Sequence, residues 1–178
     1  MKKIVSETDV EILKKIRENI TSLLKDLKLE WDKPNLRILE IAPQVHEGVK
    51  ATFENAEVET LDISPEYKPT YVADLCNTNN DIIPDNSFDL VVVTEVLEHT
   101  LQPFDAVKEI YRILKPGGTI VGSTPFDFRI HGPLPDCWRF TEHGLRALFK
   151  EFEEIEIYPL ENPERFLMPW HYIFRFKK

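Results

Sequence analysis

The chain has 178 residues, the size of one domain, and 42% of them are hydrophobic and 30% charged. Its formal net charge of −9 is not offset by a basic patch, so general binding to nucleic acid is not expected. The sequence also lacks an apolar membrane span and the apolar core of a signal peptide. Two isolated cysteines, Cys76 and Cys137, are typical of reduced thiols in a cytoplasmic protein and predict no metal site.

The first predicted element is an amphipathic helix within residues 1–30. Hydrophobic residues recur there at steps of three and four, from Ile12 to Leu27. Ser6 or Thr8 can cap this helix, the latter because a glutamate follows it three residues later.

After Pro34 the sequence alternates between strand-like and helix-like segments. A short helix is expected within 45–53 and a longer one over 103–114, which ends before two consecutive glycines. Short apolar or β-branched runs predict strands at residues 36–42, 56–63, 71–75, 88–93 and 119–123. This alternation predicts a parallel sheet with helices on both faces.

The last part of the chain departs from this alternation. A long loop is expected over 124–140, followed by a short helix. Residues 154–158 and 172–176 alternate with period two, and Ile155 and Ile157 should share one face. Because only a loop separates these two strands, they should pair antiparallel.

Together these elements predict one doubly wound α/β domain over residues 1–178, with a helix at 1–30 and a core at 36–178. In such sheets, ligands bind beyond the carboxyl ends of the strands, where the strand order reverses. The expected ligand site therefore lies among residues 42–46, 62–64, 74–76 and 94–97.

Three acidic residues stand at ends of the predicted strands. Asp62 follows the second strand, where a carboxylate can accept hydrogen bonds from both hydroxyls of a ribose. Asp74 closes the third strand and can accept from an amine, and Glu40 in the first can meet an ammonium group. Strand ends are also often acidic simply because they are solvated, so these residues alone leave the ligand open.

Two longer segments carry a resemblance to a known family. Residues 85–99 include a strand followed by Val96-Leu97-Glu98-His99, and residues 109–118 end in Arg112-Ile113-Leu114-Lys115-Pro116-Gly117-Gly118. With Val72-Ala73-Asp74-Leu75, this pattern resembles the class I S-adenosylmethionine-dependent methyltransferases, in their small single-domain, type 11-like branch. The resemblance implies a Rossmann-like methyltransferase fold with a seven-stranded, mostly parallel sheet and an antiparallel carboxy-terminal hairpin. It also implies S-adenosylmethionine as the cofactor.

The resemblance further implies roles for individual residues toward that cofactor. Glu40 would lie near its amino-acid end, Asp62 would bind the ribose diol and Ile63 would flank the adenine. Asp74 would face the adenine amine with Leu75 beside it, and Thr94 and Glu95 would line the methionine portion through main-chain atoms. Ala42 and Pro43 would belong to the first loop around the cofactor.

That first loop departs from the family pattern. The three glycines that the family usually carries are replaced by Ala42, Gln44 and His46. Glycine allows close backbone approach and positive φ, whereas Pro43 removes a donor and should restrict Ala42 to extended conformations. The loop could take another path with Gly48 supplying flexibility, it could bind weakly, or the site could be inactive.

The loop at 124–140 should cover the acceptor side of the site. Its segment Pro135–Thr141 resembles a block found in small methyltransferases. His131 and His99 are the candidate bases for an oxygen acceptor, with Asp136 orienting an imidazole. Structural interpretations stay open: in these, Trp138 fills the core and His99 satisfies the backbone of the helix that it begins.

Three functions remain open at this stage. The first is methyl transfer to a small molecule or to a small feature of a larger substrate. The second is a catalytically inactive methyltransferase-like protein that binds a partner or serves as a scaffold. The third is a nucleotide binder, which the missing glycines disfavour because a pyrophosphate needs free backbone donors.

Overall fold

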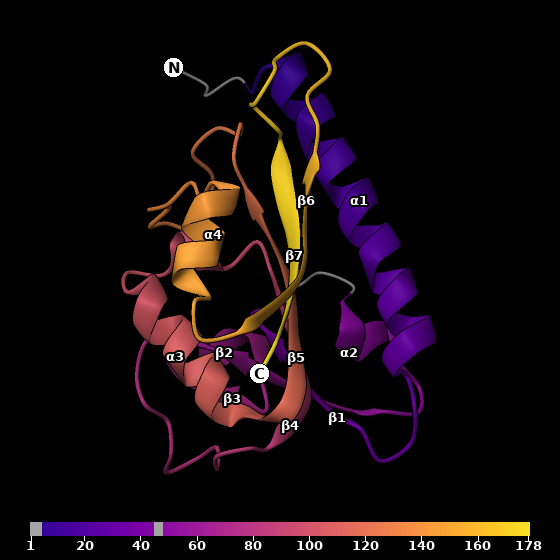
Figure 1. The fold of residues 1–178 in the computed structure, drawn as a ribbon, viewed down its shortest axis with the longest axis vertical. Helices are drawn as coiled ribbons and strands as arrows, with labels where there is room; N and C mark the ends of the chain where they lie inside the picture. Colours follow the sequence, from indigo (N-terminus) through magenta and orange to yellow (C-terminus); the bar gives the residue numbers. More distant parts are fainter. Residues whose placement is uncertain (1–4, 45–47) are drawn as a thin grey trace.

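The computed structural model describes residues 5–44 and 48–178. A seven-stranded sheet runs through the molecule in the order β3-β2-β1-β4-β5-β7-β6 (Figure 1). Strand β7 runs antiparallel to both neighbours, and the other pairs are parallel. The elements in chain order are α1 (Glu7–Trp31), β1 (Arg37–Ile41), α2 (Val49–Thr52), β2 (Glu57–Asp62), η1 (Pro65–Tyr67), β3 (Tyr71–Val72), β4 (Phe88–Thr94), η2 (Leu97–His99), α3 (Pro103–Ile113), β5 (Leu114–Pro125), α4 (Glu142–Leu148), β6 (Glu153–Leu160) and β7 (His171–Lys177). The predicted fold class is confirmed.

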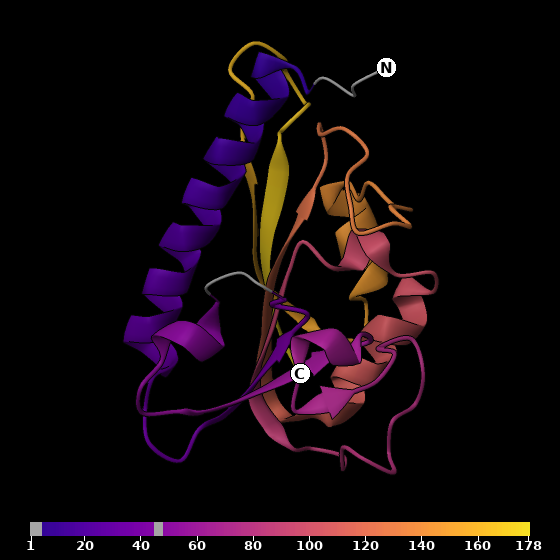
Figure 2. The ribbon, with the colours of Figure 1, turned by 180° about the vertical axis from the view of Figure 1, so that it is seen from behind.

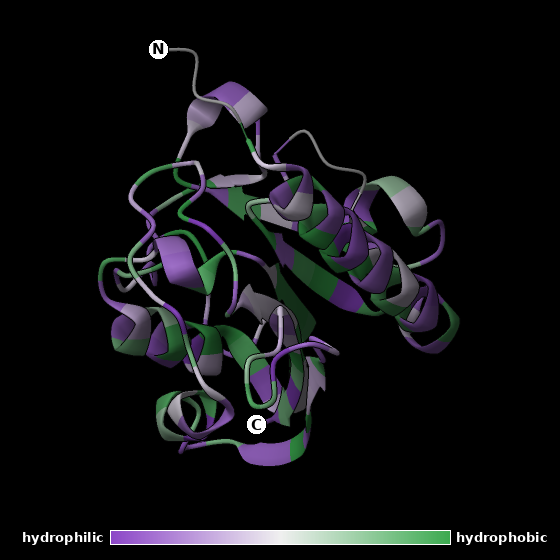
Figure 3. Cartoon of the chain, turned by 90° about the horizontal axis from the view of Figure 1, so that it is seen from above, coloured by the Kyte–Doolittle hydropathy of each residue, from purple (hydrophilic) through white to green (hydrophobic). Residues whose placement is uncertain are grey.

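Helices cover both faces of the sheet. Helices α1 and α2 lie on one face and α3 and α4 on the other, as the two opposite views show (Figures 1 and 2). Strand β4 is buried on both sides: Val92 packs with the α1 side, whereas Val91 packs with the α3 side. This explains its continuous apolar sequence, and Figure 3 shows the central strands as mainly hydrophobic. No helix in the described ranges is long and apolar enough to span a bilayer.

The ends of several elements differ from the prediction, and the predicted strand over 71–75 stops at Val72, so that Asp74 lies in the loop after β3. Ser6 caps α1, because its hydroxyl accepts from the backbone N–H of Asp9 at 3.1 Å, so the Thr8 capping box was wrong. Strand β5 begins directly after α3 and runs on to Pro125. The Gly117 N–H donates to the Lys178 carbonyl at 2.9 Å, which draws the two glycines into the sheet.

Strand β6 contains a bulge that the alternation did not predict. Glu154 pairs with Phe176 and Glu156 with Arg175, so Ile155 is the additional residue between them. Ile155 is consequently 50% exposed. The regular alternation expected over 154–158 is thus interrupted at the register shift from Glu154 to Glu156.

Candidate functional site

A cavity of about 750 Å³ opens at the carboxyl ends of β1, β2 and β4. Its floor includes Glu40, Ala42, Asp62, Asp74, Thr94 and Glu95 from the strand ends and the loops that follow them. Helix α1 forms one wall with Leu13, Ile16, Ile20 and Leu24, and the loop after β5 forms another with Phe128, His131 and Pro135. The cavity lies where the strand order predicted it, and its size suits a cofactor together with a small substrate.

The first loop keeps a glycine-like backbone without glycine. Ala42 and Gln44 have φ values of 48° and 51°, in the left-handed region that L-residues seldom occupy. The prediction that Pro43 restricts Ala42 to extended conformations was therefore wrong. The Ala42 N–H donates to the Leu61 carbonyl at 2.7 Å, and this bond anchors the turn to β2. His46 lies outside the described residues.

Glu40 lines the cavity, but both oxygens of its carboxylate accept hydrogen bonds from the protein backbone. Its two oxygens accept from the backbone N–H groups of Val49 at 2.7 Å and Lys50 at 2.8 Å, at the first turn of α2. Burial raises the pKa of Glu40, although these bonds oppose the rise. A Cβ atom on Gly48 would overlap this carboxylate. Gly48 is thus needed for the close approach of Glu40.

The acid at the end of β2 lines the cavity and has one carboxylate oxygen without a partner among the described residues. Asp62 is only 2% exposed, and its Oδ1 accepts from the Ser64 N–H at 2.8 Å. Its Oδ2 is buried and receives no hydrogen bond from the described residues. A buried carboxylate oxygen normally has a partner, so a ligand hydroxyl is the missing donor that this position suits.

The other residues expected around the cofactor also reach the cavity. Asp74 lines it while its Oδ1 accepts from the Cys76 N–H at 2.8 Å. Leu75 is buried beside it, and Ile63 is 69% exposed at the opening. An exposed apolar side chain at the mouth of a cavity is available to pack on a planar ring.

Glu95 turns its side chain toward the sheet. Its Oε1 accepts from the Ser123 hydroxyl at 2.8 Å and lies 3.3 Å from Nδ1 of His171. The Asn19 amide of α1 contacts the other nitrogen of His171, Nε2, at 2.8 Å. Because the amide N–H can only donate, Nε2 is the acceptor and Nδ1 carries the proton. This chain of contacts joins α1 to Glu95 and to strand β5.

A histidine and carboxylate cluster forms the far end of the cavity. Nδ1 of His99 lies 2.9 Å from the Pro135 carbonyl, which only accepts, so Nδ1 carries the proton there. Burial lowers the pKa of His99 and favours its neutral form. Nδ1 of His131 lies 3.0 Å from Oδ2 of Asp136, without the alignment of a full hydrogen bond. Both rings therefore keep Nδ1 toward the loop.

Asp136 is held in place by Arg139. The guanidinium donates to both carboxylate oxygens, at 2.5 and 2.8 Å, and the His131 backbone N–H adds a bond of 2.9 Å. Burial alone would raise the pKa of Asp136, but these donors hold it well below its ordinary value. The structure thus brings Asp136 next to His131, and the orienting role of Asp136 stays a prediction.

Glu98 lies next to both histidines in the protein interior. It is fully buried, and neither carboxylate oxygen receives a hydrogen bond from the described residues. Its Oε1 lies 3.7 Å from Nε2 of His99 and 3.6 Å from Nε2 of His131. Burial raises the pKa of Glu98 well above its ordinary value, and the nearby Glu95 adds to the rise.

Comparison with known families agrees with this architecture. Residues 35–122, which run from before β1 into β5, match the model of the methyltransferase domain family. The chain carries a class I methyltransferase domain of the type 11 branch. A comparison with curated protein sequences finds no match.

Solved structures share the fold of this methyltransferase domain at low sequence identity. A SAM dependent methyltransferase from Archaeoglobus fulgidus has a TM-score of 0.71 and 19% identity, over 91% of this chain and 94% of that one. The N-methyltransferase NodS from Bradyrhizobium japonicum WM9, in complex with S-adenosyl-L-homocysteine, has a TM-score of 0.63 and 18% identity, over 97% and 99%. The [4+2]-cyclase SpnF has a TM-score of 0.67 and 14% identity, over 90% and 80%. Since one neighbour is named a cyclase, the fold alone does not fix the reaction.

Sequence reasoning missed two buried polar residues of the methyltransferase domain. Glu98 was read only as part of a family block, although a glutamate between Leu97 and His99 in an apolar run was a usable signal. His171 precedes the alternating segment of the last strand and carried no signal of its own.

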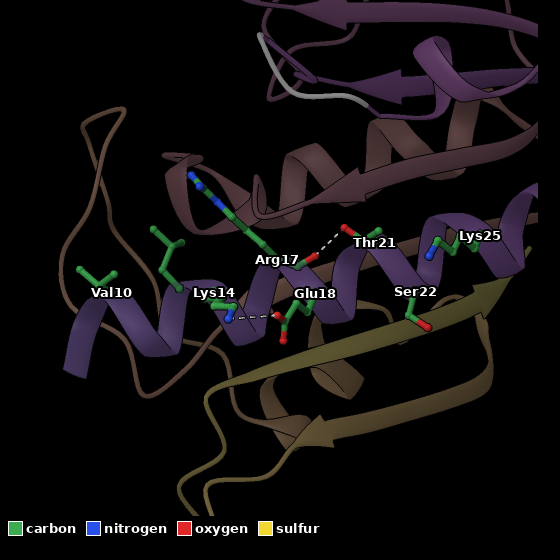
Figure 4. Close-up of a pocket in the computed structure, with 8 residues that line it drawn as sticks. Val10, Lys14, Arg17, Glu18, Thr21, Ser22 and Lys25 are labelled. Carbon is green, nitrogen blue, oxygen red and sulfur yellow. Dashed lines mark hydrogen bonds and ion pairs between the residues drawn. The ribbon is translucent and has the colours of Figure 1, made fainter. Parts of the chain in front are cut away.

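A second hollow lies along α1 (Figure 4). It measures about 490 Å³ and is lined by α1 residues, among them Arg17, Thr21 and Lys25. Arg17 also lines the main cavity, and Figure 4 shows its side chain extending away from the helix. The hollow brings together no second cluster of chemically reactive side chains among the described residues that line it.

Proposed function

We propose that this protein is an S-adenosylmethionine-dependent methyltransferase that acts on a small molecule or on a small feature of a larger one. The observation that carries the proposal is the buried, unpartnered Oδ2 of Asp62 in a cavity at the strand ends of a methyltransferase domain. A carboxylate with one fixed and one free oxygen suits a vicinal diol.

The proposed cofactor orientation follows the strand ends. Asp62 would accept from the ribose hydroxyls, Ile63 would pack on the adenine, and Asp74 with Leu75 would face the adenine amine. Ala42, Pro43, Thr94 and Glu95 would surround the amino-acid end through their backbones. Glu40 would act as a positioning residue, because both its oxygens already hold the first turn of α2. The bound cofactor would supply an electrophilic methyl group on a sulfonium.

The acceptor would enter between α1 and the loop after β5. Methyl transfer is a direct displacement, so the main task of these walls is to align the acceptor and exclude water. His131 is the proposed base for an oxygen acceptor, since its Nδ1 lies 3.0 Å from Asp136 and its Nε2 is left to take the proton. His99, whose Nδ1 is tied to Pro135, would stand beside it.

The alternative function is a methyltransferase-like protein without catalysis that binds a partner. The replaced glycines of the first loop motivate it. The left-handed φ of Ala42 and Gln44 weighs against it, since the loop keeps the backbone conformation that glycine would adopt.

Calorimetry on the full chain tests the proposal. S-adenosylmethionine and S-adenosylhomocysteine should bind, and NAD should not. Asp62→Ala should weaken the affinity by about 1–3 kcal/mol, the scale of a hydrogen bond to a charged group. Asp81→Ala, at an exposed acid outside the cavity, is the matched control and should bind like the wild type. Equal affinity of a folded Asp62→Ala protein would reject the ribose assignment, and no binding by the wild type would favour the scaffold.

A further inference from the structure

The cluster of Glu98, His99 and His131 has the composition and spacing of a cation site. One ligand atom from each of these residues lies within 4.8 Å of the others. The three residues come from η2 and from the loop after β5, so only the fold brings them together. The loop is held against η2 because the backbone N–H groups of Cys137 and Trp138 donate to the Glu98 carbonyl at 2.7 and 3.2 Å.

The ligand atoms already point at one another. Nε2 of His99 and Nε2 of His131 lie 3.7 and 3.6 Å from the same carboxylate oxygen of Glu98. These separations are too long for hydrogen bonds. They are close to the ~3.3 Å between neighbouring ligands of a tetrahedral ion with bonds of about 2.0–2.1 Å. Because the three ligand atoms lie within 4.8 Å of one another, a cation between them would draw the cluster together.

The surroundings of the histidines match those of metal ligands. A ligating histidine usually gives its second nitrogen to a carbonyl or carboxylate, which fixes the ring and the tautomer. Here Pro135 supplies the carbonyl for His99, and Asp136 supplies the carboxylate for His131. Each ring thus has its Nδ1 toward a second residue and its Nε2 toward Glu98.

The buried carboxylate provides an independent reason for a ligand. Both oxygens of Glu98 are buried without a hydrogen bond from the described residues, which is costly unless something else satisfies them. A cation would satisfy them. His99 and His131 also line the cavity, so the site has an entry path from it.

We infer that Glu98, His99 and His131 form a binding site for one divalent transition-metal cation of the Zn²⁺ type at the acceptor end of the cavity. Two imidazoles and one carboxylate suit Zn²⁺, whereas Mg²⁺ prefers a shell of oxygen ligands. The sequence analysis predicted no metal site, since no histidine or cysteine spacing indicated one. The structure assigns the site through three residues that are not all neighbours in the chain.

The function of the cation rests on the proposed methyl transfer. An acceptor hydroxyl bound to the cation would give its proton to solvent water more readily than a free hydroxyl does, and its oxygen would then take the methyl group. With the cation present, Nε2 of His131 is a ligand and not a base, so activation of the acceptor passes to the cation. The site itself does not depend on the methyl-transfer reaction.

The test uses the full chain after removal of metals with EDTA. Titration with Zn²⁺ should give one saturable equivalent, Co²⁺ should give the visible absorption of a site with nitrogen and oxygen ligands, and Mg²⁺ should not compete. Glu98→Gln and His131→Gln should weaken Zn²⁺ binding at least tenfold. His143→Ala, at an exposed histidine, and Cys137→Ser, at the neighbouring thiol, should leave binding unchanged.

Two outcomes would overturn the inference. One is wild-type protein without a saturable equivalent of Zn²⁺ and without a rise in melting temperature upon its addition, which needs no variant to interpret. The other is a folded Glu98→Gln protein that binds Zn²⁺ as the wild type does. Asp62→Ala should bind Zn²⁺ normally, so failure of the cofactor proposal and failure of the cation proposal are distinguishable.

Discussion

At the scale of single residues, positive backbone angles mark the first loop. Gln44 lines the cavity with a φ of 51°, where glycine would be unstrained. The left-handed conformation costs an L-residue about 1–2 kcal/mol, which glycine avoids at a smaller entropic cost. The chain accepts this strain in a loop that lines the cavity.

Gln44→Gly should therefore raise the free energy of unfolding by up to about 1 kcal/mol, measured by urea denaturation. Lys68→Gly is the matched control, because Lys68 has a φ of 50° on the exposed surface outside the cavity. If the bulk of Gln44 limits cofactor entry, its removal should also tighten binding of S-adenosylhomocysteine. A loss of stability in Gln44→Gly alone would mean that its side chain makes contacts that outweigh the strain.

At the scale of elements, short α2 depends on a carboxylate from β1. Glu40 accepts from the N–H groups of Val49 and Lys50, which the first turn of a helix leaves without intrahelical partners. The contact needs Gly48, since any side chain there would occupy the place of the carboxylate. A helix of this length would not hold together in isolation.

Gly48→Ala should lower the free energy of unfolding by roughly 1–3 kcal/mol, the cost of overpacking a tight site. Gly144→Ala offers a control of opposite sign. It lies in α4 with its nearest added contact at 3.4 Å, so the change should raise stability by about 0.5–1 kcal/mol. Thermal and urea unfolding of both variants measure the difference. A neutral Gly48→Ala would contradict the close approach of Glu40.

At the scale of the whole molecule, long-range ties fix α1 against the sheet. Asp32 is the C-cap residue of α1. Its carboxylate accepts from the backbone N–H groups of Glu54, Asn55 and Ala56, the three residues that directly precede β2. Its shortest bond is 2.7 Å, to Asn55. Because α1 is also a cavity wall, this tie helps to define the shape of the acceptor side.

The same tie predicts how stability depends on pH. Burial opposes the shift, but the three backbone donors lower the pKa of Asp32 from 3.8 to about 2. A depressed pKa contributes stability that is complete above the unfolded value and is lost as the pH falls from about 4 to 2. Asp32→Asn should therefore lower the melting temperature at neutral pH and flatten its fall in that range. Asp26→Asn, on the same helix, should keep the wild-type profile.

Much of the fold could be predicted from local sequence patterns. Apolar runs such as Leu90–Val93 have no polar face, so they required a strand buried on both sides. The position of the acids that follow or end the strands could also be predicted locally, because parallel strands bring their carboxyl ends to one edge of the sheet. The positions of Glu40, Asp62 and Asp74 at the cavity followed from that rule.

The tertiary structure alone decided what each of these groups faces. Glu40 and Asp62 both stand near strand ends. Backbone N–H groups donate to both oxygens of Glu40, whereas Oδ2 of Asp62 receives no hydrogen bond from the described residues. The bulge at Ile155 and the left-handed turn at Ala42 depend on pairing across the sheet, which local preference does not encode. Glu98 and His131 meet because a loop folds back onto η2 through hydrogen bonds between residues distant in sequence. Sequence periodicity determines which face is buried, whereas the partner of a buried polar atom is set by three-dimensional packing.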